Sequence, residues 1–229
     1  HLKAYGVTYR ALSKGYTADW LLNYRGGSFA IDYSDDVLLD CRLQGVYFEQ
    51  LDPGAAVDIY SFVQQEDQNM DVVRMEKAPK VAVYVPPGFH PWDDAVTLAL
   101  EYSGIPYDKF WNEAIIRGDL NKYDWLHLHH EDFTGQYGKF YASYANAQWY
   151  VENQRRYEAD AKRLGYSKVS NMMLDVAKGI KSFVGSGGFL FAMCSATDSY
   201  DIALSAEGSD IAANMFDGDA ADPQAQSKL

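Results

Sequence analysis

Three absences limit what this 229-residue chain can do. It has only two cysteines, too few for a disulfide framework, which favours a reducing compartment such as the cytoplasm. It has no apolar run of the roughly 18 residues or more that mark a membrane-spanning helix. Its 20 Lys and Arg face 32 Asp and Glu, a net charge of −12, whereas phosphate binding needs clustered cations. We therefore expect a soluble protein without a nucleic-acid or membrane partner.

The second half of the sequence alternates strand-length apolar runs with helical patterns. Apolar runs occupy 80–85, 107–111, 123–129 and 188–194, and helical patterns occupy 92–103, 135–145, 148–164, 168–185 and 197–206. Almost continuously apolar strands that alternate with helices are typical of a parallel sheet covered on both faces. We predict an α/β fold for residues 78–229, a three-layer flavodoxin-like parallel sheet. Ligands of such sheets bind at the carboxyl ends of the strands.

Residues 1–77 are predicted to form a separate α/β portion. A helix is expected over 2–14, strands over 19–23, 28–32 and 46–51, and a helix over 53–66. This alternation favours a parallel or mixed sheet. If the portion is a βα unit, the strand that should precede residue 2 is missing. Residues 70–79 have the composition of a linker.

Cys194 lies where a hydrophobic strand meets a helical pattern. A nucleophile elbow is a sharp strand-to-helix turn that needs small residues two positions before and after the nucleophile, and Ala192 and Ala196 meet that need. A helix N-terminus also favours a thiolate. The alternative is a buried, inert thiol, because free cysteine is among the most buried residue types. Ser195 and Asp198 could contact a ligand at this turn, although Asp198 suits helix capping equally well.

A second group of reactive side chains follows the strand at 123–129, in Leu126-His-Leu-His-His-Glu-Asp-Phe133. His129 and His130 are candidates for a general base beside Cys194, and Glu131 could orient the imidazole. Asp132 is a candidate ligand contact. Structural hydrogen bonding is the alternative for all four. Neighbours in sequence rarely converge as metal ligands, so we predict no metal.

Trp92 and Asp93 belong to the loop after the strand at 80–85, so they are expected at the same edge of the sheet. We predict that they help to bind a ligand there. Helix capping is the alternative for Asp93, because acidic side chains stabilise the first turn of a helix.

The order of these elements, with Gly187-Gly-Phe-Leu-Phe-Ala-Met-Cys194, resembles the class I glutamine amidotransferase-like superfamily over residues 79–217. The segments 21–28, 91–96 and 123–136 further resemble bacterial proteins labelled asparagine synthetase B. The resemblance implies a cysteine nucleophile that hydrolyses a carboxamide, without a cofactor, and a chain cut at both ends. In that superfamily the catalytic histidine lies downstream of the cysteine, but residues 195–229 contain no histidine.

Three interpretations of this departure remain open: the histidine lies beyond residue 229, the protein binds rather than cleaves, or His129 or His130 is recruited. The predicted function is therefore Cys194-dependent amide hydrolysis. The alternative is non-catalytic binding of a small ligand, as expected for the related trehalose-utilisation type of this fold. Either function implies a small-molecule partner. The sequence makes no prediction of oligomeric state.

Overall fold

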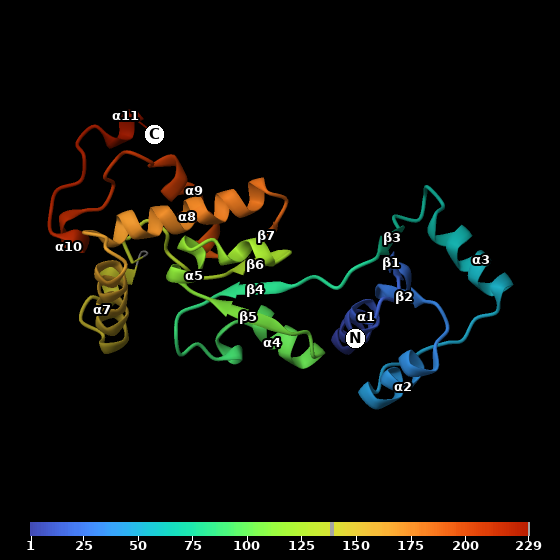
Figure 1. The fold of residues 1–229 in the computed structure, drawn as a ribbon. Helices are drawn as coiled ribbons and strands as arrows, with labels where there is room; N and C mark the ends of the chain where they lie inside the picture. The colour runs from blue at the N-terminus through green and yellow to red at the C-terminus, as the bar shows by residue number, and fades with distance from the viewer. Residues whose placement is uncertain (138–139, 229) are drawn as a thin grey trace. The chain divides into compact units, whose positions relative to one another are not determined.

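A four-stranded parallel sheet organises the C-terminal part of the computed structural model, which describes residues 1–137 and 140–228. Its strands are β4 (Val81–Tyr84), β5 (Tyr107–Phe110), β6 (Trp125–Leu128) and β7 (Phe189–Ala192). They are hydrogen-bonded in the order β5-β4-β6-β7, and all three pairings are parallel (Figure 1). The predicted α/β class with a flavodoxin-like parallel sheet is confirmed.

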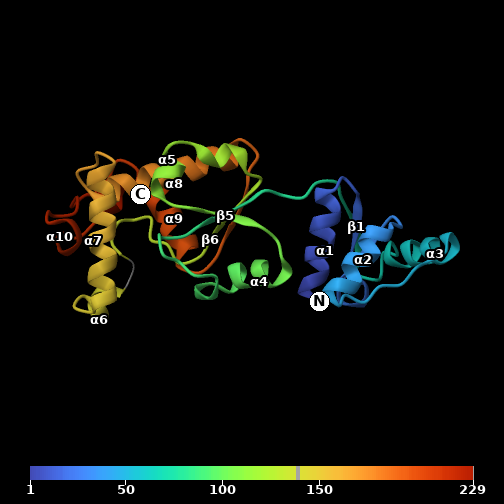
Figure 2. The ribbon, with the colours of Figure 1, turned by 60° about the horizontal axis from the view of Figure 1, so that its bottom comes forward.

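Helices connect the strands of this sheet. The helices that follow β4 are, in chain order, α4 (Ala95–Ser103), α5 (Asn112–Ile116), α6 (Tyr141–Tyr144), α7 (Gln148–Arg163), α8 (Val169–Gly185), α9 (Ser195–Ser205), α10 (Asn214–Asp217) and α11 (Ala225–Lys228), with 3-10 turns at Pro91–Asp93 and Asp119–Lys122. The long helix α8 lies along the sheet beside α5 and α9, as Figures 1 and 2 show from two directions. Because these strands are parallel, β4, β6 and β7 all have their carboxyl ends at the same edge of the sheet.

The core of this part lies between the sheet and α8. Leu126 and Leu128 of β6 are fully buried, as are Met172, Val176 and Ile180 of α8. The three helical residues are spaced by four positions, so they form one stripe along the side of α8 that faces the strands. Burial of this stripe fixes the sheet beneath the loops that follow β6 and β7.

The N-terminal part contains a second, smaller sheet. Its elements are α1 (Leu2–Ser13), β1 (Ala18–Leu22), a 3-10 turn (Tyr24–Gly26), β2 (Ser28–Ile31), α2 (Asp35–Gln44), α3 (Pro53–Val63) and β3 (Asp71–Met75). Strand β1 pairs with β2 and with β3, and both pairings are antiparallel. The predicted parallel or mixed sheet is therefore wrong.

Some local elements differ from the sequence predictions. Residues 46–51, predicted as a strand, form none. Their side chains pack locally, with the Phe48 ring 5.8 Å from the Arg42 guanidinium and Glu49 accepting a hydrogen bond from Arg25 at 3.1 Å. Residues 71–75, predicted within a linker, supply the edge strand β3. Of the helix predicted over 135–145, residues 138–139 lie outside the described residues, and α6 covers 141–144.

The chain divides into two compact units. The first comprises His1–Pro79 together with His90–Pro106, and the second comprises Lys80–Phe89 together with the chain from Tyr107 onward. Helix α4 and its preceding turn therefore group with the N-terminal unit. Among the described helices, none has both the length and the apolar character needed to cross a bilayer.

Candidate functional site

The turn that carries Cys194 joins β7 to α9. Pairing of the strands continues for one residue beyond β7, where the Met193 amide donates to the Leu128 carbonyl at 3.0 Å. Cys194 then adopts φ 51° and ψ −137°, and α9 begins at Ser195. Ala196 is fully buried, so a larger side chain two residues after the cysteine would not fit without rearrangement. The strand-turn-helix predicted around Cys194 is therefore present.

Cys194 is exposed, whereas the second cysteine, Cys41, is buried in the N-terminal unit. A non-glycine residue with positive φ outside the helical and strand regions is strained, at a cost of about 1–3 kcal/mol. Such strain persists only where the surrounding structure enforces it, and it is concentrated at functional turns. The thiol is thus held outward by a backbone conformation that a cysteine does not adopt freely.

The segment after β6 is hydrogen-bonded directly to this turn. The carbonyl groups of three consecutive residues each accept a bond from it: His129 from the Ala196 amide (3.3 Å), His130 from the Ser195 hydroxyl (2.9 Å), and Glu131 from the Ser199 hydroxyl (2.7 Å). The structure therefore brings the predicted residues His129, His130 and Glu131 to the backbone that carries Cys194, although 65 residues separate Ser195 from His130.

The histidine rings of β6 and of the segment after it lie close to one another. The ring centroids of His129 and His130 are 3.5 Å apart, and those of His127 and His129 are 6.1 Å apart. His127 is fully buried and its ring also stacks on Phe191 of β7 at 5.7 Å. His127 thus belongs to the sheet, while the two following imidazoles lie where the strand ends. An imidazole can serve as general base or as general acid, provided that it reaches the reacting group.

Glu131 turns back toward its own strand. Its side chain is part of a residue only 8% exposed, and Oε2 accepts the backbone N–H of His129 at 2.8 Å. Burial raises the pKa values of Tyr84 and Tyr157, and the nearby Glu131 carboxylate raises both further. Its hydrogen bond with the His129 N–H means that the Glu131 carboxylate orders the backbone at His129.

Asp132 and Asp198 are the two other predicted site residues of this unit. Asp132 Oδ1 accepts from the Thr134 amide (2.7 Å) and hydroxyl (2.5 Å), which closes the turn after the histidines. Asp198 is exposed in the first turn of α9, where an acidic side chain is favourable.

Trp92 and Asp93 belong to the N-terminal unit. The Trp92 indole is 69% exposed and stacks on His90, with centroids 4.5 Å apart. Asp93 Oδ2 accepts the His90 N–H at 2.9 Å, which is the capping geometry considered for this residue. Their ligand-binding role stays a prediction.

Ser199 is the residue of this site that sequence reasoning missed. It is 8% exposed and its hydroxyl bonds to the Glu131 carbonyl. The available signal was its spacing: Ser199 lies four residues after Ser195, so both hydroxyls lie on one side of α9. A serine at that spacing does not by itself show which distant carbonyl it will meet.

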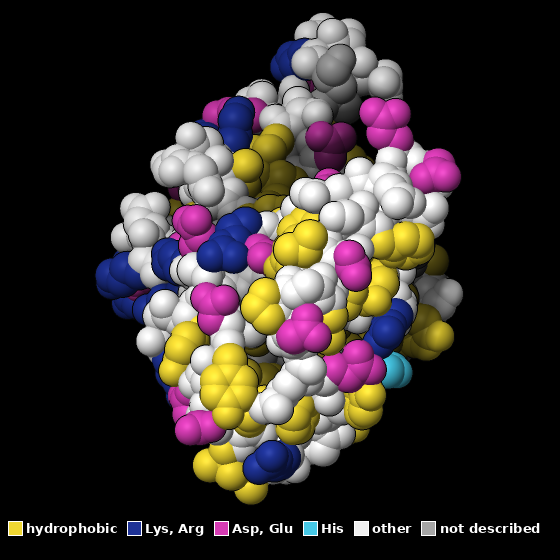
Figure 3. Space-filling view, turned by 90° about the vertical axis from the view of Figure 1, so that its right-hand side faces the viewer, with side chains coloured by type: hydrophobic (Ala, Val, Ile, Leu, Met, Phe, Trp, Pro, Cys, Tyr) yellow, Lys and Arg dark blue, Asp and Glu magenta, His cyan; other side chains and the backbone are white. Residues whose placement is uncertain are grey.

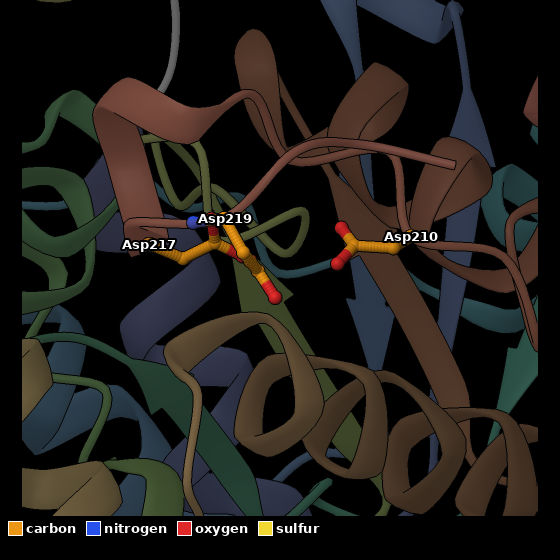
Figure 4. A group of neighbouring side chains, drawn as sticks. All are labelled: Asp210, Asp217 and Asp219. Atoms are coloured by element: carbon orange, nitrogen blue, oxygen red, sulfur yellow. The ribbon is translucent and has the colours of Figure 1, made fainter. Parts of the chain in front are cut away.

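An acidic cluster lies beyond the end of α9. Carboxylate oxygens of Asp210, Asp217 and Asp219 lie within 4.8 Å of one another (Figure 4). The Lys168 ammonium lies 2.7, 3.2 and 2.6 Å from them, respectively. Hydrogen bonding to Asp210 first, and to Asp219 next, raises the pKa of Lys168. The Lys168 ammonium is therefore paired with all three carboxylates, which a bound metal ion would also need to contact.

A surface pocket of about 210 Å³ lies next to this cluster. Its walls come from the start of α8, from the end of α9 and the segment after it, and from the loop after β6, including Phe133 and Lys168. Within the described part of the chain, Cys194 is not among the residues that line it. The pocket is thus a neighbour of the loop that carries the histidines, but it does not enclose the thiol.

Comparisons with known proteins do not extend this description. No family model, no curated protein and no solved structure matched the chain.

Proposed function

We propose that this chain is a glutamine amidotransferase-like hydrolase in which Cys194 attacks a small carboxamide such as that of glutamine. The observation that carries the proposal is the conformation of Cys194: an exposed thiol, on a residue with φ 51° and ψ −137°, at the end of a parallel strand. A nucleophile in this position meets a substrate from the open edge of the sheet.

Cys194 would form a bond from Sγ to the carboxamide carbon, and the carbonyl oxygen would become an oxyanion. The first N–H groups of a helix have no intrahelical partner, and the Ser195 N–H at the start of α9 would donate to that oxyanion. The next N–H, that of Ala196, already donates to the His129 carbonyl at 3.3 Å. His129 or His130 would take the thiol proton and deliver it to the leaving nitrogen, which departs as ammonia. Water then attacks the thioester carbon, and the carboxylic acid and the thiol are released.

The direct test is ammonia release from glutamine and asparagine. We expect activity in the wild-type chain, its loss in Cys194→Ala, and its retention in Cys41→Ala, because Cys41 is the second free cysteine and lies in the other unit. Equal rates for wild type and Cys194→Ala would refute hydrolysis by this thiol.

Selective alkylation separates the thiol's reactivity from the choice of substrate. Iodoacetamide followed by peptide mass spectrometry should label Cys194 well before Cys41, and His129→Ala or His130→Ala should slow the labelling if that imidazole accepts the thiol proton. Labelling that neither substitution changes would remove both histidines from the mechanism.

Binding without cleavage is the second candidate. It is favoured by the absence of any histidine in residues 195–229, where the resembling superfamily has its catalytic imidazole. In that case Cys194→Ala would bind a small ligand as well as the wild-type chain does, and neither would release ammonia. Calorimetric titration with glutamine and with a disaccharide distinguishes the two ligand classes.

A further inference from the structure

Helix α2 has two opposite apolar faces, of which only one is covered. Val37 and Cys41 are 9% and 7% exposed and pack against Val7 and Ala11 of α1. Leu39 is 55% exposed and belongs to the opposite side, because two positions along a helix correspond to a rotation of about 200°.

The exposed face of α2 carries charge of opposite sign at its two ends. Asp35, Leu39, Arg42 and Leu43 are the exposed residues of the helix, and they fall within an arc of about 100°. Leu43 is 74% exposed. We call this row of four side chains the α2 stripe. Asp35 lies in its first turn and Arg42 in its last, about 10 Å further along the axis.

The two charges of the α2 stripe have neutral partners within the unit, whereas the other acidic charges of this helix are in ion pairs. The Arg42 guanidinium lies 5.8 Å from the centroid of the Phe48 ring. Asp36 pairs with Lys14 at 2.6 Å, and Asp40 pairs with Arg10 at 2.8 Å. Asp35 instead accepts a hydrogen bond from the Tyr33 hydroxyl. Across residues 1–137 and 140–228, no ion pair engages Asp35 or Arg42.

A row that reads acid, leucine, then base and leucine is complementary to itself in the antiparallel direction. If a second copy of α2 lies antiparallel on the first, Asp35 of each copy comes alongside Arg42 of the other. Leu39 of both copies then lies near the twofold axis between the ion pairs, and each Leu43 lies just outside them. By symmetry the contact contains two such ion pairs, as an isologous interface requires. A parallel arrangement would place like charges together and is disfavoured.

We propose that the α2 stripe is a self-association surface, through which two copies of this chain pair as an antiparallel two-helix contact. The occupant is a second copy because the charge order of the stripe is self-complementary. The face shown in Figure 3 has hydrophobic side chains interspersed with acidic ones, so apolar exposure alone does not distinguish a docking surface on this molecule. The contact is smaller than a standard stable interface, so the dimer is expected to be weak.

Sedimentation velocity over micromolar concentrations tests the contact. The wild-type chain should show a concentration-dependent monomer–dimer equilibrium. Leu39→Glu and Leu43→Glu should abolish it, and Leu98→Glu, which alters a half-exposed leucine on α4, should leave it unchanged. A wild-type chain that stays monomeric throughout this range overturns the proposal.

Charge reversal tests the antiparallel register. Asp35→Arg and Arg42→Asp should each weaken self-association about tenfold or more, because two attractive pairs become two repulsive ones. An equimolar mixture of these two variants should regain dimerisation as a heterodimer, since every facing pair is then of opposite sign. Circular dichroism of each variant checks that the helix is retained. A dimer that neither reversal weakens, or a mixture that does not associate, overturns the proposal.

Discussion

Replacement of Cys194 by glycine is expected to stabilise the second unit relative to replacement by alanine. With φ 51° and ψ −137°, alanine keeps the backbone strain of about 1–3 kcal/mol, whereas glycine adopts the conformation freely. Glycine also gives a more flexible unfolded chain, which costs about 0.5–1 kcal/mol. Because the position is exposed, neither substitution removes much buried surface. The Gly variant should therefore be more stable than the Ala variant by about 0.5–2 kcal/mol.

Native-state hydrogen exchange of β7 and α9 amides is the suitable assay, because it gives a free energy of opening for this unit alone. Asp201 supplies the control, since it is exposed in the middle of α9. There the order should reverse, with Asp201→Gly less stable than Asp201→Ala by about 1 kcal/mol. If Cys194→Gly is no more stable than Cys194→Ala while the control pair shows its expected order, the backbone at the turn is not strained.

Three further substitutions test other parts of the structure. Ser199→Ala should destabilise the loop after β6 by about 1–3 kcal/mol, read from hydrogen exchange of residues 129–133, because a buried carbonyl loses its donor; unchanged exchange would contradict this. Lys168→Met should increase exchange in 206–222. In the wild type, the Lys168 ammonium lowers the pKa of Asp219, so this stabilisation is present above about pH 4 and is lost as the pH falls further; exchange independent of Lys168 would contradict the ion-pair account. Gly6→Ala should lower the melting temperature, because a Cβ would lie 1.7 Å from the Ser103 carbonyl oxygen, whereas Gly185→Ala meets no atom within 4 Å and should not; equal melting temperatures would contradict the close packing.

The parallel sheet could be predicted because its strands are identified by their own composition. Val81–Tyr84 is buried along its whole length, so an unbroken apolar run marks it in the sequence. β3 gave no such signal. Its pattern of partial exposure includes Arg74, which donates to Asp19 of β1, so the strand is defined by its neighbour rather than by its own residues. The antiparallel direction of the sheet in the N-terminal unit could not be predicted for the same reason.

The candidate site likewise has one part that local sequence predicts and one part that it does not. Strand, small flanking residues and helix pattern around Cys194 are local properties, and they were sufficient to predict the turn. Which residues would lie beside it depends on strand order, because β6 is the neighbour of β7 and not of β5. That order follows from packing of the whole sheet, so the sequence offered His129 and His130 only as candidates.

Strand order also changes the significance of the missing downstream histidine. A histidine after the cysteine in sequence reaches the thiol only if the chain folds back to it. β6 precedes β7 in the sequence and ends at the same edge of the sheet. The carbonyl groups of three consecutive residues after β6 accept hydrogen bonds from residues that follow Cys194. The backbone that carries His129 and His130 is thus hydrogen-bonded to the residues at the start of α9. A base for Cys194 therefore need not come from residues 195–229, and the reactivity of Cys194 in His129→Ala and His130→Ala decides whether either imidazole acts as one.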